Sequence, residues 1–273
     1  MSLIFTVLLS MSCGPSSENT TSENQYTFGD LLLVQSLSYS RTGDNETIRM
    51  QDDYNYEAER LISRVETDLD SGRTRTFTYT YENDLISDIQ IHNGNDELES
   101  EIKIYYNDNN QVYSYEYIDD LNTNYSTYSL ATLSYENNQT LLCDGKSWSS
   151  VEYKDVYDSV LVYTTNDDGN IVQINEIDDC YFSAPSINGG IELSLEYDDN
   201  PSPFINITGN NQILNTIITP FTGSITAGFS NNATNQTGYQ AQEWVYTYNN
   251  AGYPNNIQWQ SNNAREDVEV VYY

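Results

Sequence analysis

The sequence predicts an all-β fold: an antiparallel meander of repeated β-hairpins that curves into a barrel or a rolled sheet. Three observations predict it. The chain repeats itself about every 25 residues, aromatic side chains alternate with polar ones inside each repeat, and short runs of Asn, Asp and Gly separate the apolar segments. No helical period of useful length appears, so we expect little or no helix.

A recurring tyrosine marks the repeat, and in four copies a second tyrosine precedes it by one or two residues. Copies lie at Tyr56, Tyr81, Tyr106, Tyr135, Tyr163, Tyr197 and Tyr248. The first three steps are 25, 25 and 29 residues, and the 51 residues from Tyr197 to Tyr248 span two periods, one of them degenerate. Repeats of this kind predict one hairpin per copy.

Each copy has the alternation of a half-buried strand. Phe77, Tyr79 and Tyr81 are separated by threonines, which places the aromatic rings on one face and the threonines on the other. The Asn, Asp and Gly residues that follow tolerate the positive φ of tight turns. Two strands of roughly 8 to 9 residues fit each copy, on the order of 14 strands in all. We expect the tyrosine hydroxyls to reach water at the sheet rim.

The amino terminus has the pattern of an export signal. Residues 3–9 are apolar but far too few to span a bilayer, and Cys13 follows the small residues Ser10 and Ser12. This resembles a bacterial lipoprotein signal, which implies that Cys13 is diacylated and begins the mature protein. The alternative is a buried amino-terminal strand that ends in an ordinary cysteine. We predict a signal peptide over residues 1–12, a flexible acylated linker over 13–27 and one repeat-built β domain over 28–273.

The remaining cysteines are Cys143 and Cys180. In an oxidising compartment they would form a disulfide if their Cα atoms come within about 7 Å, and the alternative is that they lie on separate strands. Two cysteines 37 positions apart and the single histidine, His92, make no metal-ligand spacing. The sequence therefore predicts no metal site and no cofactor.

The charge of the chain limits its partners. With 10 Lys and Arg against 41 Asp and Glu, the formal net charge is -31. Nucleic acids and anionic lipids need basic patches, so neither is an expected partner. Divalent cations, cationic partners or simple solubility in a salty habitat remain open. We expect a monomer that is attached to the membrane through its lipid.

The tandem Tyr-x-Tyr units resemble the YD-type repeats of Rhs-like proteins. More closely, residues 196–204 and 246–257 resemble elements of a family of bacterial lipoproteins with a porin-like β fold. The resemblance covers about residues 50–273. It implies a β architecture and an outer-membrane location, on the cell surface or the periplasmic face, and it implies no activity.

Catalytic motifs are missing from the sequence. His92 lies directly before a predicted turn, where an exposed strand end is the expected role. Carboxylate pairs such as Asp119 and Asp120 lie at predicted strand ends, although general acid and base chemistry of the glycosidase type remains an alternative. We predict no catalytic residue.

Calcium binding is the sharpest metal hypothesis. Residues 166–170 form an Asn-Asp-Asp-Gly-Asn loop, but in the register of an EF-hand the closing position is Asn175, which is no carboxylate. We expect an ordinary turn here.

Aromatic side chains suggest a ligand platform. Trp148 lies in residues 145–150, which have the composition of a loop, so its ring is the best candidate to contact a glycan or protein ligand. Trp244, Trp259 and the tyrosine stripes can equally pack the sheet. Residues 201–242 break the repeat, and long irregular insertions often carry binding function.

Two functions are therefore expected from the sequence. The favoured one is a cell-envelope lipoprotein with a non-catalytic β scaffold for ligand or partner binding, or for a structural role. The alternative is a polysaccharide hydrolase that uses two carboxylates. A membrane-spanning porin is disfavoured because Arg60, Arg64 and Asp88 are expected on the outer face, where a lipid-facing band lacks charge.

Overall fold

The computed structural model describes residues 32–43, 46–121, 127–144, 148–149, 152–153, 159–176, 192–208, 230–238, 241–260 and 264–273. The elements are β1 (Val34–Gly43), β2 (Glu46–Glu57), β3 (Arg60–Asp68), β4 (Thr74–Glu82), β5 (Leu85–Asn93), β6 (Leu98–Tyr106), β7 (Val112–Asp119), β8 (Thr127–Glu136), β9 (Gln139–Asp144), β10 (Trp148–Ser149), β11 (Glu152–Tyr153), β12 (Ser159–Thr165), β13 (Ile171–Glu176), β14 (Glu192–Pro201), α1 (Ile205–Thr208), β15 (Asn231–Gly238), β16 (Gln242–Tyr248), β17 (Pro254–Gln260) and β18 (Ala264–Tyr272).

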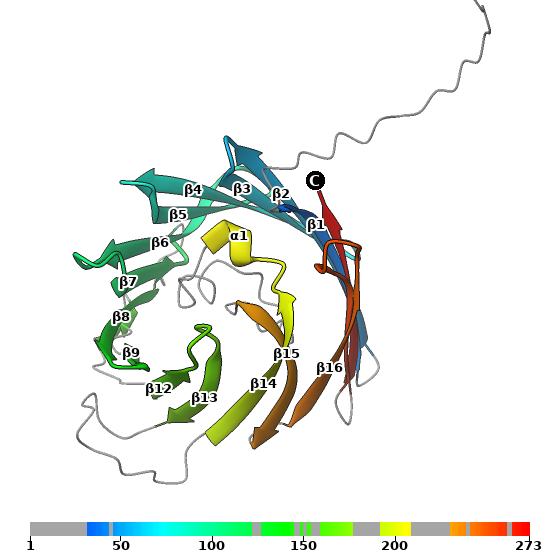
Figure 1. Cartoon of the computed structure of the whole chain (residues 1–273). Coiled ribbons are helices and arrows are strands. Elements are labelled where there is room, and N and C mark those ends of the chain that lie inside the picture. The colour runs from blue at the N-terminus through cyan, green and yellow to red at the C-terminus, as the bar shows by residue number, and fades with distance from the viewer. Residues whose placement is uncertain are drawn as a thin grey trace, which may run out of the picture.

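The strands form one closed antiparallel barrel (Figure 1). Among the described residues, sixteen of the eighteen strands make the ring, because β9 pairs directly with β12 and leaves the two-residue strands β10 and β11 outside it. Nine residue pairs between β1 and β18, from Val34↔Tyr272 to Gly43↔Ala264, close the ring. The predicted all-β meander is confirmed. The estimate of about 14 strands was low because β1 and β15 lack the tyrosine repeat.

The inner face of the barrel is mainly apolar, apart from a few charged side chains such as Arg64. Cross-strand partners share a face, and Phe77↔Ile91 and Tyr79↔Ile89 are typical pairs of the inner side. In Figure 1, α1 lies inside the ring, and Phe204 beside it contacts the ring of Tyr54 at 6.2 Å between centroids. One cluster of buried apolar side chains includes members from every long strand except β12, whose apolar residues pack against it. Each fully buried large side chain contributes about 1.5 to 3 kcal/mol to folding.

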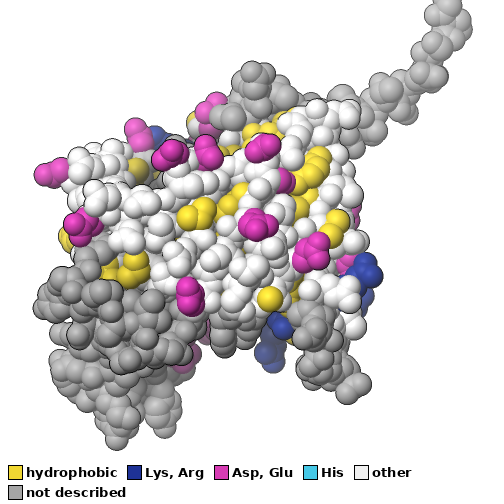
Figure 2. Space-filling model, turned by 60° about the horizontal axis from the view of Figure 1, so that its bottom comes forward, with side chains coloured by type: hydrophobic (Ala, Val, Ile, Leu, Met, Phe, Trp, Pro, Cys, Tyr) yellow, Lys and Arg dark blue, Asp and Glu magenta, His cyan; other side chains and the backbone are white. Residues whose placement is uncertain are grey.

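The outer face is polar. Thr78 and Thr80 are exposed there, and Asp88 of β5 is paired in register with Lys103 of β6. Figure 2 shows Asp and Glu side chains scattered over one side of the molecule, without a continuous hydrophobic band. Arg60 and Asp88 lie outside as expected, but the prediction for Arg64 was wrong. Arg64 is 2% exposed and lies on the inner face beside Phe77.

A β-bulge explains the position of Arg64. In the pairing of β2 with β3, Asn55 faces Ser63 and the next residue, Tyr56, faces Leu61, so Ile62 is an extra residue. An extra residue reverses the alternation beyond it. Leu61 and Arg64 therefore both point inward, although they are three positions apart.

The same bulge recurs after the turn of other hairpins. The extra residues are Ile62, Ser87, Tyr113, Val172 and Asn255. The bulge is therefore a structural part of the repeat that the tyrosine spacing alone does not reveal.

Tyrosine hydroxyls join successive hairpins at one end of the barrel. Each one donates to a backbone carbonyl on the preceding strand: Tyr81 to Leu61 (2.9 Å), Tyr106 to Ile86 (2.8 Å), Tyr135 to Val112 (2.6 Å), Tyr197 to Ile171 (2.5 Å), Tyr246 to Ala233 (2.6 Å) and Tyr272 to Pro254 (2.8 Å). We call this contact the tyrosine clasp. The expectation that these hydroxyls reach water was wrong, because bulges interrupt the ladder beside several of the accepting carbonyls.

Asparagine organises the longer turns. The backbone N–H of the first residue donates across the loop, and its Oδ1 accepts two further backbone N–H groups. Loops of this geometry begin at Asn93, Asn107, Asn166 and Asn249.

Helix is almost absent from the described residues, as predicted. Helix α1 has four residues, and no helix in the described ranges combines the length and the apolar composition that a membrane crossing requires. Helix α1 and strand β15 both lie in residues 201–242, which the sequence predicted to be irregular.

Candidate functional site

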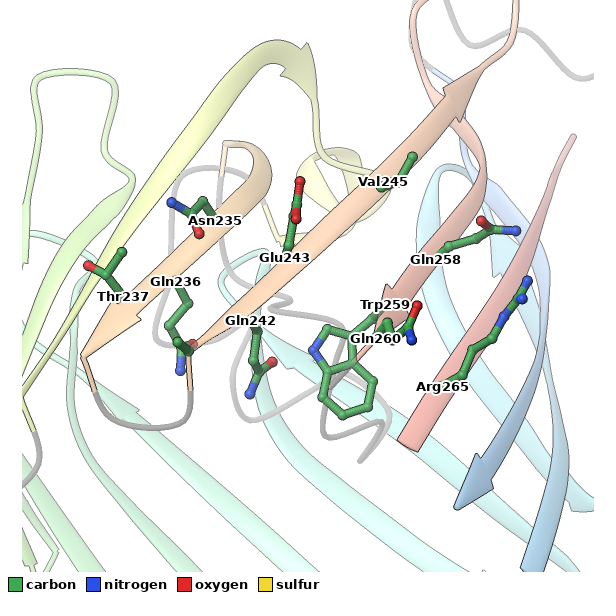
Figure 3. A pocket seen from close by; sticks show the side chains of 11 residues that line it. Asn235, Gln236, Thr237, Gln242, Glu243, Val245, Gln258, Trp259, Gln260 and Arg265 are labelled. Carbon is green, nitrogen blue, oxygen red and sulfur yellow. The ribbon is translucent and has the colours of Figure 1, made fainter. Parts of the chain in front are cut away.

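A groove crosses one rim of the barrel at the ends of β15, β16, β17 and β18 (Figure 3). We call it the rim groove. Its volume is about 720 Å³. Thr237, Gln242, Gln260 and Arg265 all lie within two residues of a strand end, so the groove is at the barrel edge, where β15–β16 and β17–β18 turn.

The groove exists because β15 and β16 diverge. These strands share two registered pairs, Asn235↔Glu243 and Gln236↔Gln242. Strand β15 instead follows β14 closely. A Cβ at Gly238, where φ is +89°, would lie 2.3 Å from the carbonyl oxygen of Glu192, so this approach requires glycine. The space on the β16 side of β15 is therefore incompletely filled.

Uncharged amides dominate the lining. Each Asn or Gln amide offers two N–H donors and one carbonyl acceptor. The groove is lined by Asn235, Gln236, Gln242, Gln258 and Gln260, together with Thr237, Ala241, Glu243, Val245, Trp259 and Arg265. This combination suits hydroxyl or amide groups of an uncharged polar ligand better than it suits an ion.

Trp259 contributes an unused donor. Its side chain is 8% exposed and lines the groove from the inner face, beside Trp244 on β16. Among the described residues, its indole N–H has no hydrogen-bond partner. In Figure 3, Gln242 and Trp259 project to the other side of the strands from Glu243 and Val245.

Charged side chains meet inside the barrel, away from the groove lining. Arg64 Nε lies 3.9 Å from Asp52 Oδ1, and its Nη2 lies 3.9 Å from Glu66 Oε2. The guanidinium also lies 3.7 Å from the ring centroid of Phe77. Neither oxygen of Asp52 has a hydrogen-bond partner in the part of the chain that the structure describes.

Burial dominates the electrostatics of this cluster. It raises the pKa of Asp52 from 3.8 to about 7, the Arg64 charge opposes that rise, and Glu66 and Asp53 add to it. A carboxyl with a raised pKa is what a general acid requires. Asp52, however, is 0% exposed, so a substrate in solution has no surface of this group to contact.

The rim groove does not supply the carboxylate pair of a glycosidase either. Among the described residues that line it, Glu243 is the one carboxylate. Hydrolysis of a glycosidic bond uses two such groups on either side of the bond.

The loop over residues 166–170 is a turn. The Oδ1 of Asn166 accepts the backbone N–H groups of Asp168 and Asn170, at 3.1 and 2.9 Å, and Gly169 has a φ of +85°. The side-chain oxygen of Asn166 therefore accepts hydrogen bonds within the turn itself. No group of three or more His, Cys, Asp or Glu side chains in the described ranges is arranged to hold a metal ion.

The remaining predicted site residues are the cysteines and Trp148. Cys143 is half-buried on β9 and pairs in register with Thr132 and Val160, whereas Cys13 and Cys180 lie outside the described residues. Lipidation and the disulfide therefore stay predictions. Trp148 is in the short strand β10 and not in a loop, because its backbone pairs with Tyr128 and Tyr153. Its side chain is outside the described part.

Sequence reasoning missed the rim groove. Gln258 and Gln260 sit at alternate positions of one strand and so share a face, a signal that could have marked two amides side by side, whereas Gln242 of β16 points to the other face. Nothing in the sequence shows that β15 leaves β16, so the hollow itself could not be foreseen.

No protein-family profile matches the chain, and no curated protein matches it. Solved structures do. A porin-like protein from Bacteroides vulgatus aligns over 89% of this chain and 99% of its own, with a TM-score of 0.52 and 10% sequence identity. A second, from Bacteroides uniformis, aligns over 88% and 98%, with a TM-score of 0.38 and 12% identity. The first likeness supports the porin-like β fold and nothing finer.

Proposed function

We propose that this protein is an exported, lipid-anchored envelope protein whose closed barrel stands in water as a non-catalytic binding scaffold, with the rim groove as a site for an uncharged polar ligand. The observation that carries the proposal is the polarity of the barrel. Its apolar face is inside and packed, and its polar face is outside.

This polarity is the reverse of a membrane-spanning barrel, which turns an apolar band outward to lipid and keeps a polar interior. Thr78, Thr80 and Asp88 would face hydrocarbon if this barrel were inserted. On a barrel surface at the middle of a bilayer, Arg or Lys costs about 2 to 4 kcal/mol, and Asp or Glu costs less. Attachment through the lipid on Cys13 lets the barrel stay at the membrane without that cost.

The absence of catalysis is part of the proposal. Two carboxyls with a raised pKa support it: Asp52 is fully buried, and Asp88, whose pKa is raised by burial and by Glu101, lies on the outer face and does not line the rim groove. The carboxyl of the rim groove, Glu243, has no second carboxylate in the described lining. The alternative of a polysaccharide hydrolase would require both carboxyls in one open cleft.

The anchor is tested by intact mass and detergent partitioning of protein from native membranes, compared with Cys13→Ser. We expect acyl mass and partitioning into detergent for the wild type and neither for the variant. Equal behaviour of the two proteins would contradict the anchor.

The location of the barrel in water is tested separately by ion conductance across planar bilayers. We expect no channels from either the wild type or Cys13→Ser. Stable unitary conductance steps from wild-type protein would show an inserted pore and overturn the proposal.

A further inference from the structure

Two tyrosines form an exposed aromatic surface on the outer face of the barrel. Tyr105 of β6 is 36% exposed and Tyr113 of β7 is 47% exposed, and their ring centroids are 6.3 Å apart with the planes tilted by 44°. The other exposed large apolar side chains among the described residues are Ile48, Ile62, Leu69, Val245 and Val271. None of these has a ring. We call Tyr105 and Tyr113 the tyrosine shelf.

The bulge of the β6–β7 hairpin places the shelf. Tyr105 pairs in register with Ser114, and Tyr106 pairs with Val112, so Tyr113 is the extra residue between them. A bulge re-aims the side chain of its extra residue. Tyr113 therefore turns outward beside Tyr105, above Ser114, which is 7% exposed and donates to the carbonyl of Ala131.

The shelf is one wall of a hollow of about 400 Å³ at the opposite rim from the groove of Figure 3. Polar groups from two turns complete it. Asn83 belongs to the β4–β5 turn and Asp108 and Asn110 to the β6–β7 loop, while Glu82 and Ser87 come from the adjoining strand ends.

Neutral hydroxyl chemistry fits this arrangement. The apolar C–H face of a sugar ring packs on an aromatic ring, and its hydroxyls both donate and accept hydrogen bonds. The amides of Asn83 and Asn110 and the carboxylates of Glu82 and Asp108 supply donors and acceptors at the edge of the rings. Ligand sites commonly combine apolar walls with a few polar groups in this way.

A cationic partner fits less well. The ammonium of Lys103 already lies on this face, 2.9 Å from Glu101, and at Tyr105 its charge opposes that of Glu116. A shallow pair of tilted rings also lacks the enclosing geometry of an aromatic cage for ammonium groups.

We propose that the tyrosine shelf is a binding site for uncharged carbohydrate chains, with Tyr105 and Tyr113 stacking on sugar rings and the turn residues Asn83, Asn110 and Asp108 contacting hydroxyls. The inference rests on the proposed function in one respect, because it needs the outer face of the barrel to be in water.

The test uses full-length Cys13→Ser protein and isothermal titration with maltohexaose, cellohexaose, laminarihexaose, mannohexaose and xylohexaose. We expect at least one of them to bind. Tyr105→Ala and Tyr113→Ala should each raise its Kd about tenfold, which corresponds to roughly 1.4 kcal/mol of lost stacking. Tyr113→Phe keeps the ring and should stay within about threefold of the parent.

Val271→Ala, at an outward position of β18 that is 40% exposed and lines neither the rim groove nor the hollow beside the shelf, is the matched control and should leave the Kd unchanged. Circular dichroism melts establish that each variant is folded. Loss of binding in Gln260→Ala, which changes the rim groove, with unchanged binding in the tyrosine variants would assign the sugar to the groove and overturn this inference.

Two further results would overturn it. One is the absence of binding by all five oligosaccharides. The other is salt-sensitive binding of hexalysine in their place, which would assign the shelf to cationic peptides. The conductance and partitioning experiments contain no sugar, so their outcomes for the proposed function are read independently.

Discussion

The hydroxyl of the repeated tyrosine donates a hydrogen bond to a backbone carbonyl on the preceding strand. At Tyr81 it donates to Leu61 at 2.9 Å, and the ring stays half-buried. We expect Tyr81→Phe to lower the free energy of unfolding by about 1 kcal/mol, the net value of one hydrogen bond, because the ring packing is kept. Urea denaturation measures the change.

Tyr113→Phe is the control for this prediction, since its ring is exposed and its hydroxyl has no clasp. It should unfold within a few tenths of a kcal/mol of the parent protein. If both substitutions cost the same, the clasp does not stabilise the barrel.

Asp52 makes the stability of the fold depend on pH in an unusual direction. Its pKa is about 7 in the folded protein against an ordinary value of 3.8, so between these values the folded state holds a proton that the unfolded chain releases. This contribution to stability is complete below pH 3.8 and is lost as the pH rises through 7. Each pKa unit corresponds to about 1.4 kcal/mol.

Asp52→Asn removes that dependence. We expect the difference in unfolding free energy, variant minus wild type, to rise by about 2.5 kcal/mol from pH 5 to pH 8. Thr78→Ala, at an exposed position of the outer face, removes no titratable group and is the control, which should keep the wild-type pH profile. Parallel pH profiles for Asp52→Asn and wild type would contradict a raised pKa at Asp52.

At the level of single residues, the sequence allowed the alternation of Phe77, Tyr79 and Tyr81 to be predicted, because local sterics fix a period of two. The same alternation predicted Arg64 on the outer face, whereas it lies on the inner face. The error arises at Ile62, where one extra residue reverses the alternation. No local pattern distinguishes a bulged strand from a regular one. Such a reversal can therefore be recognised only from the register of the two paired strands.

Among the elements, the hairpin turns are the units that the sequence predicted best. Asn83 and Asp84, with φ values of +50° and +67°, form the kind of two-residue turn that their chemistry favours. The turn between β2 and β3 is different. It holds Ala58 and Glu59 at φ values of +46° and +70°, where side chains with a Cβ are strained.

Glu59→Gly should relieve part of this strain. We expect the free energy of unfolding to rise by about 1 kcal/mol, because a left-handed conformation costs an ordinary residue about that much. Thermal and urea denaturation measure it. Asn137→Gly, at φ +54° in the β8–β9 turn, is the comparison and should gain only a few tenths, since Asn tolerates this region. A loss of stability in Glu59→Gly would contradict the strain.

For the whole molecule, the sequence did not decide between a closed barrel and an open rolled sheet. The repeat spacing predicts hairpins and their order, but closure depends on nine registered pairs between β1 and β18, which are separated by more than 200 residues. β1 carries no tyrosine pair, so the repeat did not reveal it as a strand. The rim groove and the tyrosine shelf were likewise beyond prediction, since both arise where strands diverge or bulge.

Closure also leaves no long edge of the described strands free to pair with another copy of the chain. Each of the sixteen strands of the ring has a partner on both sides in the described structure, so no long edge is open. The closing strand is reinforced beyond its ladder. The clasp of Tyr272 reaches Pro254, and the Tyr273 hydroxyl donates to the carbonyl of Tyr54 at 3.0 Å.

Deletion of residues 264–273 should therefore open the barrel. It removes β18, leaves β1 and β17 as unpaired edges and takes Val268 and Val270 out of the core, each of which is nearly fully buried. We expect a protein that self-associates through these edges, seen as oligomers by light scattering after size exclusion. Val271→Lys, at an outward position that is 40% exposed, keeps the ladder and should remain monomeric. A monomeric deletion variant with the wild-type melting temperature would mean that the sheet holds its curvature without closure, and the barrel would then be stabilised by its clasps and core alone.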